Sequence, residues 1–462
     1  MSSSQSFECQ AKLKFSTKLA YGIGELSGSL PSNILVFFFL FFLTDVVGLN
    51  PSLAGLIVMV GKIWDAINDP LIGWLSDHTR SRFGRRYPWM ILGAVPLGLS
   101  CFLLWTVPPT NNQTLLMVYY TIIALIFYAA FTAVLLPYSA LSAELTQDYD
   151  ERTNLISFRS AFSIGGSIFS LILAELIFFW VDNKQQQYLI LGLLAGIIAV
   201  IAIYISVWGT YKRYHYVQRE PGNHPQSSPL SLWQKLRVIL TNFPFLCVMA
   251  IYLCSWLSVQ TIAAILPYFV INCMQLTEEH FTRMAITVQG TALMMMIVWN
   301  FLSHRLGKKA IYLMGIPFTI IAVIGLFLLQ PGQVILMYVI AIMAGIGIAT
   351  AYIVPWSMLP DVVDLDQLKT GERREGIFFA LVVQLQKIGI ALALFMVGKL
   401  LDNAGYIPGS TGQQPDTALW AIRMIIGPLP TLLLIISLVL AYFYPITRQV
   451  HQDILLQLYH KK

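Results

Sequence analysis

Charged side chains are scarce in this sequence: Asp, Glu, Lys and Arg make up 11% of its 462 residues, whereas hydrophobic residues make up 57%. Soluble domains average roughly 25% charged residues, so this composition excludes a soluble globular protein. The ten-residue segments of alternating hydrophobicity that mark outer-membrane barrels are missing as well. The composition therefore predicts an all-α integral membrane protein.

Signals for metal, redox and nucleic-acid chemistry are also missing. The five cysteines and seven histidines show no spacing typical of metal ligands or redox pairs. The formal net charge of +6 comes mostly from a few loops, which is typical of membrane topology rather than of a nucleic-acid surface. Residues 1–17 have no cleavable signal pattern, so we expect the first apolar segment to be retained. No cofactor, resident metal or nucleic-acid partner is expected.

Apolar segments are what the sequence has in abundance, and twelve of them are long enough to cross a bilayer. A polar stretch with several prolines separates the first six from the last six. We expect an N-terminal six-helix bundle at 1–211, a cytoplasmic linker at 212–242, a C-terminal six-helix bundle at 243–445 and a cytoplasmic tail at 446–462.

Basic residues indicate the orientation, because cytoplasmic loops are enriched in Lys and Arg. The even-numbered connections are basic and the odd-numbered ones are nearly free of positive charge. Both termini are therefore predicted to be cytoplasmic, in a plasma or inner membrane. The basic residues of the even connections include Arg80, Arg82, Arg152, Lys212, Arg213, Arg305, Lys308, Lys309 and Lys369.

The two halves repeat one another in the same order. Leu75-Ser76-Asp77 corresponds to Leu302-Ser303-His304, and Pro137-Tyr138-Ser139 corresponds to Pro355-Trp356-Ser357. Parallel repeats of six helices are the plan of the major facilitator fold, in which the halves rock about a midplane site. The repeats predict a transporter that works by alternating access.

Charged and polar residues inside the second apolar segment are the first candidate site. Asp65, Asn68 and Asp69 share one helical face, because they are three and four residues apart. A carboxylate near the bilayer centre costs roughly 2.5 to 3.5 kcal/mol, which favours a functional role. Oxygen ligands of this kind suit a hard cation such as Na⁺, and the carboxylates could equally carry a proton. The alternative is an internal salt pair of Lys62 with Asp65.

Acidic and basic residues also gather at the predicted cytoplasmic ends of helices. They indicate salt bridges that hold one access state, and hence a role in gating. A membrane prenyltransferase would need a second aspartate-rich motif, which is lacking, so an enzyme is not expected. The gating candidates are Asp77, Arg85, Arg86, Asp361, Asp364 and Arg373, with Asp366 and Arg374 nearby.

Four motifs, at residues 18–24, 44–49, 64–70 and 361–364, resemble the glycoside–pentoside–hexuronide:cation symporter family, which includes the melibiose carrier. The resemblance covers nearly the whole chain and implies cation-coupled symport on the major facilitator fold. It implies a cation site formed by Asp65, Asn68 and Asp69, completed by Thr132. The coupling ion is Na⁺ or H⁺.

The family's substrate site matches only in part. The resemblance implies that Arg159 and Lys387 bind substrate, and it places Ser29 and Tyr352 at further substrate positions. The family's lysine–aspartate pair on the first helix is replaced here by Gly28 and Ser29. Glu25, one turn earlier, either supplies a replacement carboxylate or makes a structural hydrogen bond.

The second half also resembles the sodium-dependent lysophosphatidylcholine symporters, through Pro355–Val363 and Tyr444-Pro445-Ile446. We therefore expect a symporter for a sugar, glycoside or uronide, with a lysophospholipid as the alternative substrate. A channel is the rival class and would not exchange trapped for external substrate. The expected partners are the small-molecule substrate, the coupling cation and the lipid bilayer, and the expected state is a monomer.

Overall fold

The computed structural model describes residues 13–146, 148–218, 242–371, 374–410 and 413–460. Within these ranges the regular structure is helical and no strand is present. The chain divides into two compact units, Met1–Pro225 (unit 1) and Gln226–Lys462 (unit 2). Each unit is described by itself below.

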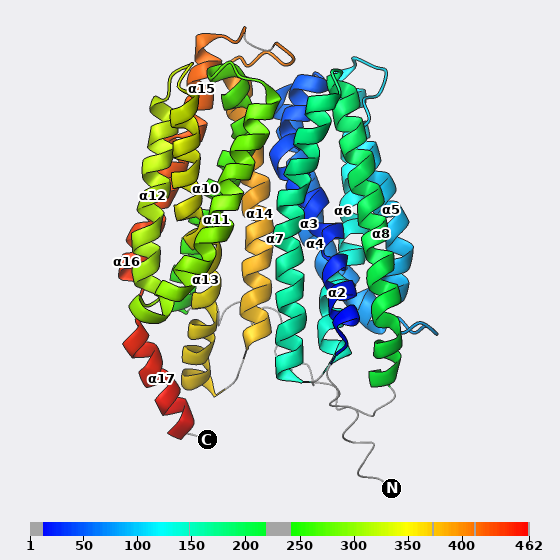
Figure 1. The fold of residues 1–462 in the computed structure, drawn as a ribbon, viewed down its shortest axis with the longest axis vertical. Helices are drawn as coiled ribbons and strands as arrows, with labels where there is room; N and C mark the ends of the chain where they lie inside the picture. The colour runs from blue at the N-terminus through cyan, green and yellow to red at the C-terminus, as the bar shows by residue number, and fades with distance from the viewer. Residues whose placement is uncertain (1–12, 147, 219–241, 372–373, 411–412, 461–462) are drawn as a thin grey trace. The chain divides into compact units, whose positions relative to one another are not determined.

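Unit 1 contains the first six spans (Figure 1). The first span is interrupted after Gly24, and two π-helical turns follow near its end. Pro31 lies inside it and removes one backbone donor, which weakens regular α-helix there. The elements are α2 (Phe15–Gly24), α3 (Leu26–Ile34), η1 (Leu35–Phe39), η2 (Phe42–Val46), α4 (Pro51–His78), α5 (Tyr87–Leu104), α6 (Gln113–Leu145), α7 (Tyr149–Trp180) and α8 (Lys184–Gln218).

Unit 2 contains the other six spans and a terminal helix. Its first span again ends in a π-helical turn, and its last span consists of two consecutive helices. The elements are α10 (Phe243–Tyr268), η3 (Phe269–Cys273), α11 (Glu278–Leu306), α12 (Lys308–Leu328), α13 (Val334–Thr370), α14 (Glu375–Asn403), α15 (Asp416–Ile426), α16 (Pro428–Phe443) and α17 (Arg448–His460).

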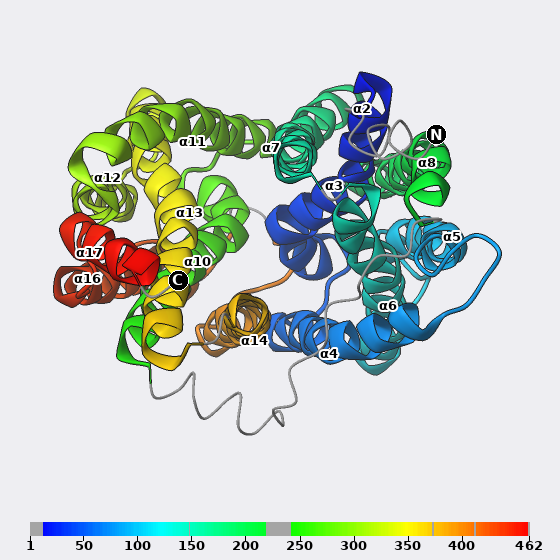
Figure 2. The ribbon, with the colours of Figure 1, turned by 90° about the horizontal axis from the view of Figure 1, so that it is seen from below.

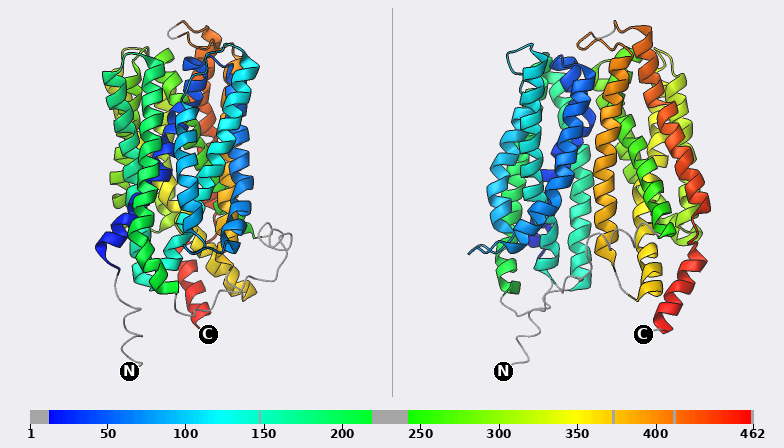
Figure 3. Two further views of the ribbon diagram at one scale, coloured as in Figure 1. Left: turned by 90° about the vertical axis from the view of Figure 1, so that its right-hand side faces the viewer. Right: turned by 180° about the vertical axis from the view of Figure 1, so that it is seen from behind.

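The helices of each unit run side by side along a common direction. In unit 1, α4 packs against α6, and α5 lies between α6 and α8 (Figure 2). In unit 2, α13 packs against α11 and α12, and α16 packs against α10 and α12. The terminal helix α17 contacts α13 and follows α16 at one end of the unit (Figure 3).

Ten segments of the described chain are long and apolar enough to cross a membrane. The first span is not among them because it is broken into short helices. The second, α4, carries Lys62, Asp65, Asp69 and Asp77, which lower its hydropathy. With these two included, the predicted all-helical membrane fold of twelve spans is confirmed.

Helix α8 extends into the stretch that the sequence assigned to the linker. Residues 212–218 are helical, although their composition is polar. Tyr214 explains the extension: it is fully buried, and its ring stands edge-to-face against Tyr87 with centroids 4.8 Å apart. The rest of the predicted linker up to residue 241 lies outside the described residues. The predicted tail contains a further helix, α17.

Candidate cation and substrate sites

A close approach of α4 and α6 positions the cation candidates. Gly61 of α4 faces Tyr128 of α6, and a Cβ atom added to Gly61 would lie 2.7 Å from Cε2 of that ring. Glycine is therefore needed for this helix spacing, as is common where membrane helices pack closely. One turn further along α4 is Asp65, and one turn further along α6 is Thr132. The close contact brings these two side chains together.

Thr132 is within hydrogen-bonding distance of both aspartates. Its Oγ1 atom lies 3.1 Å from Oδ1 of Asp65 and 3.2 Å from Oδ1 of Asp69. Thr132 and Asp65 are each 2% exposed. A hydroxyl has one hydrogen to donate and two lone pairs that accept, so it can also act as an oxygen ligand. The structure thus gathers three of the four predicted cation ligands around one point.

Asn68, the fourth predicted ligand, is also buried on α4. Its Nδ2 atom has no hydrogen-bond partner within the described residues. Lys62 lies on the same face, with its Nζ atom 4.8 Å from the centroid of the Tyr128 ring, and it interacts electrostatically with Asp65 and Asp69. Two carboxylates and one ammonium give this buried group a net charge of −1. Lys62 therefore offsets one carboxylate and leaves the other to be balanced.

The predicted substrate residues Glu25 and Arg159 form an ion pair inside unit 1. Nε of Arg159 lies 2.7 Å from Oε2 of Glu25, which connects α7 to the break between α2 and α3. The guanidinium carbon also lies 5.5 Å from the centroid of the Tyr138 ring. Glu25 is therefore paired with Arg159, the positively charged residue that the sequence predicts in the substrate site.

Two tyrosines beside this pair were not predicted as site residues. Tyr138 stacks on Tyr21, with ring centroids 4.9 Å apart, and its hydroxyl donates to the backbone oxygen of Tyr21 at 2.7 Å. Tyr138 belongs to the repeated Pro-Tyr-Ser motif, which was the signal available in the sequence. Tyr21 thus holds the Tyr138 ring in place, and the guanidinium of Arg159 lies over that ring.

The other substrate candidates occupy different surroundings. Ser29 is buried against α7, since a Cβ atom on Gly166 would lie 2.2 Å from its Oγ atom. That Oγ atom has no hydrogen-bond partner in the described part of the chain. Tyr352 belongs to α13 of unit 2, where its ring stands edge-to-face against Trp256 at 5.2 Å. Lys387 lies on α14, also in unit 2.

The gating candidates of unit 1 meet on a glutamate that the sequence did not single out. Nε of Arg85 and Nε of Arg86 lie 2.9 and 3.1 Å from Oε1 of Glu144. Arg86 also bridges to Asp77 at 2.5 Å. Partial burial alone would lower the pKa of Arg85, but the hydrogen bond and the charge of Glu144 raise it. These contacts join the ends of α4 and α6 through the α4–α5 loop.

The gating candidates of unit 2 also pair with residues that were not predicted. Nζ of Lys308 lies 2.7 and 2.9 Å from the two carboxylate oxygens of Asp361. Nε2 of His451, on α17, lies 3.1 Å from Asp364 and 3.4 Å from Asp361. Asp361 and Asp364 thus attach α12 and α17 to α13. Arg373 lies outside the described residues.

Comparison with known sequences identifies the family. A sequence profile described as MFS/sugar transport protein matches residues 20–448. The chain belongs to this family. It is 45% identical to an uncharacterized symporter of Synechocystis sp., over 98% of each chain. It is 26% identical to the sodium-dependent lysophosphatidylcholine symporter 1 of Xenopus tropicalis, over 97% of this chain and 90% of the other.

Solved transporter structures share the fold. The xylose transporter of E. coli aligns with a TM-score of 0.64 over 94% of this chain and 98% of the other, at 14% identity. An identity this low supports the fold alone. As expected from the sequence, the MFS/sugar transport family and this neighbour are transporters and not enzymes.

Proposed function

We propose that this member of the MFS/sugar transport family is a cation-coupled symporter whose coupling ion binds Asp65, Asn68, Asp69 and Thr132. The observation that carries the proposal is the shared hydroxyl of Thr132 within 3.2 Å of both carboxylates. In α4 and α6 the charges at this depth sum to −1, and an uncompensated charge within the bilayer is costly. One monovalent cation removes that charge.

Both candidate coupling ions suit this group of side chains. Na⁺ would take carboxylate, hydroxyl and amide oxygens as ligands, and a proton would neutralise one carboxylate directly. One charge moving down 100 mV releases roughly 2.3 kcal/mol. That sustains about a 40-fold concentration gradient of a neutral substrate. The sodium-dependent relative from Xenopus tropicalis favours Na⁺.

The Glu25–Arg159 pair favours a neutral, hydroxyl-rich substrate such as a sugar or glycoside. The pair is neutral as a whole, and Arg159 remains 35% exposed at its side chain. A carboxylate accepts and a guanidinium donates, so together they satisfy hydroxyl groups, which do both. A uronide would bring a second carboxylate next to Glu25, and the repulsion between the two like charges disfavours its binding. We propose that Ser29 contributes to this site, and that Tyr352 and Lys387 are substrate-binding residues of unit 2.

A lysophospholipid is the second candidate substrate. The observation that favours it is the likeness to the lysophosphatidylcholine symporter over 97% of this chain. A zwitterionic headgroup carries one charge of each sign, which the same ion pair can match with its opposite charges. The two candidates differ in apolar content, because a lysophospholipid carries a long acyl chain that the protein must accommodate and a sugar carries none.

We further propose that the clusters around Glu144 and Asp361 stabilise one access state, with Arg373 contributing in unit 2. Each cluster ties helix ends together within its own unit. Basic residues concentrate near these clusters, so we assign them to the cytoplasmic face of a plasma or inner membrane, with both termini on that side. A monomer with two six-helix bundles is sufficient for alternating access.

Transport by the purified protein tests the proposal. Proteoliposomes loaded with a sugar, a uronide or a lysophospholipid should exchange it for labelled external substrate, and net uptake should require an inward Na⁺ or H⁺ gradient. A channel would equilibrate the label without exchange. Uptake that is indifferent to both ion gradients would disprove coupling. A thermal-shift screen of the same substrates with and without Na⁺ ranks the candidates beforehand.

A further inference from the structure

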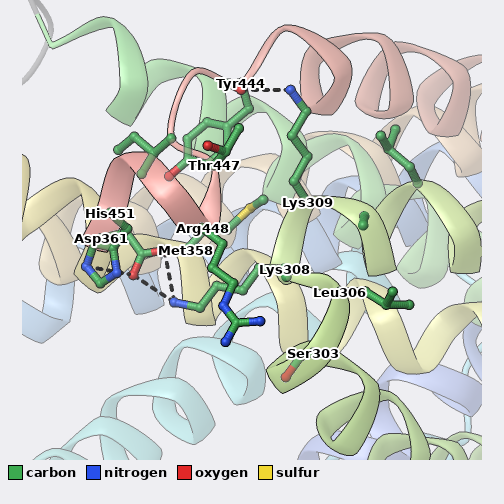
Figure 4. A pocket seen from close by; sticks show the side chains of 14 residues that line it. Ser303, Leu306, Lys308, Lys309, Met358, Asp361, Tyr444, Thr447, Arg448 and His451 are labelled. Carbon is green, nitrogen blue, oxygen red and sulfur yellow. Dashed lines mark hydrogen bonds and ion pairs between the residues drawn. The ribbon is translucent and has the colours of Figure 1, made fainter. Parts of the chain in front are cut away.

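A cavity of about 430 Å³ opens at the end of unit 2 (Figure 4). It lies between the first turn of α12, the end of α16 and the start of α17. Its volume falls in the range of ligand sites, which is roughly 300 to 1,000 Å³. It adjoins the Asp361 cluster, but none of the proposed cation or substrate ligands lines it.

The charged residues that line it are mostly basic. Lys308, Lys309 and Arg448 face it together with Asp361, and Lys308 neutralises Asp361 through its two short contacts. Lys309 donates to the backbone oxygens of Tyr442 and Tyr444 at 2.6 and 3.0 Å. These bonds fix the ammonium in place without neutralising it. The lining therefore carries an excess charge of +2.

Hydrogen-bond donors dominate the lining as well. Arg448 has five N–H donors, and its bond to the backbone oxygen of Arg305, at 3.0 Å, uses one of them. The first turn of α12 also contributes, because the leading N–H groups of a helix have no partner within it and favour anions. A ligand here must accept hydrogen bonds and carry negative charge.

Tyr444 closes the inner side of the cavity (Figure 4). It is 1% exposed, and its buried Oη atom has no hydrogen-bond partner among the described residues. Because this atom is not accessible from the cavity, the ligand is held by the exposed cations and not by the hydroxyl.

The depth of the cavity indicates where the acceptor comes from. One membrane span begins at Lys308 and another ends at Phe443, so the cavity lies at the boundary of the apolar core. Tyr442 and Phe443 are 67% and 65% exposed beside it. Exposed aromatic residues at span ends mark the depth of lipid headgroups. Basic pockets between helices at this level suit anionic headgroups.

We propose that this cavity binds the phosphate of an anionic phospholipid headgroup, held by Arg448 and Lys309. Occupation would link α12, α16 and α17 through one ligand. Lys308 stays with Asp361 and shapes the cavity from α12. The site therefore ties the terminal helix to the membrane surface and is independent of the transported substrate.

Lipid titration of the full chain tests the proposal. Protein stripped of lipid in a zwitterionic detergent would receive phosphatidylglycerol or phosphatidylcholine, with thermal unfolding followed by fluorescence and bound lipid counted by native mass spectrometry. Phosphatidylglycerol should raise the unfolding temperature and phosphatidylcholine should not. Arg448→Gln should weaken phosphatidylglycerol binding about tenfold, the loss expected for one charge-assisted hydrogen bond.

Lys309→Gln gives a second, independent test. It removes the other cation of the cavity, so it should reduce the shift that phosphatidylglycerol causes relative to the variant's own lipid-free unfolding temperature. Arg82→Gln, at an exposed arginine of unit 1, is the matched control and should behave like the parent protein. Equal lipid responses in the parent, Arg448→Gln and Lys309→Gln proteins would overturn the proposal. An equal shift with millimolar inorganic phosphate would also overturn it, because the ligand would then be a soluble phosphate.

Discussion

Arg159 donates from Nε to Oε2 of Glu25 over 2.7 Å, and this bond determines the charge of the proposed substrate site in unit 1. The sequence contains a conspicuous arginine and a carboxylate 134 positions earlier in the chain. Only their pairing shows that the arginine does not face the substrate as an unbalanced cation. An ion pair of this kind offers both a donor and an acceptor to a neutral ligand.

Glu25→Gln should shift the substrate preference toward anions. The change leaves the positive charge of Arg159 unbalanced, so the affinity ratio of an anionic to a neutral sugar should rise about tenfold, equivalent to roughly 1.4 kcal/mol. Competition of both sugars against labelled substrate measures this ratio. Glu175→Gln, on the same helix as Arg159, is the control. An unchanged ratio would show that the pair does not contact substrate.

Asp69→Asn should abolish uptake against a gradient and leave the fold intact. The substitution removes the uncompensated negative charge of the α4 cluster while keeping the size of the side chain. Counterflow should survive, because exchange needs no net ion movement. Accumulation of labelled substrate under an inward Na⁺ or H⁺ gradient is the measurement. Asp402→Asn, beside Lys399 in unit 2, should accumulate normally. Accumulation at the parent level by Asp69→Asn would refute the cation site.

Thr132→Val should lower the apparent affinity for the coupling ion about tenfold, since one oxygen ligand is lost at nearly constant volume. Thr132→Ser keeps the hydroxyl and should retain most of the parent protein's affinity for the coupling ion. The activation of transport by increasing Na⁺, or by falling pH, gives both affinities. Equal affinities in the valine and serine variants would mean that the hydroxyl is not a ligand.

Arg86→Gln should destabilise unit 1 by about 1–3 kcal/mol, because it removes one partner each from Asp77 and the nearly buried Glu144. Arg85 remains bonded to Glu144 and limits the loss. Thermal unfolding in detergent measures the effect, with exposed Arg80→Gln as the control. If both variants unfold like the parent protein, the cluster does not stabilise the helix ends.

The amino-acid sequence by itself determined the membrane-spanning class, the twelve spans and the face of α4 that carries Asp65, Asn68 and Asp69. Apolar segment length and helical periodicity are local properties, so they can be read without knowing what packs against what. The parallel repeat of motifs similarly predicted the major facilitator fold, because homologous halves keep their order along the chain.

Tertiary structure alone decided which side chains meet. Thr132 lies close to both aspartates because Gly61, which has no side chain, leaves room for the ring of Tyr128. This helix contact brings together Asp65 and Thr132, which are 67 positions apart in the sequence. The partners Glu144 and His451 carried no distinctive local signal, since an isolated charge at a helix end is common, and Lys308 indicated only a basic connection and not its pairing with Asp361. Their roles depend on helix packing, which brings distant positions to within hydrogen-bonding distance, and no local pattern encodes that.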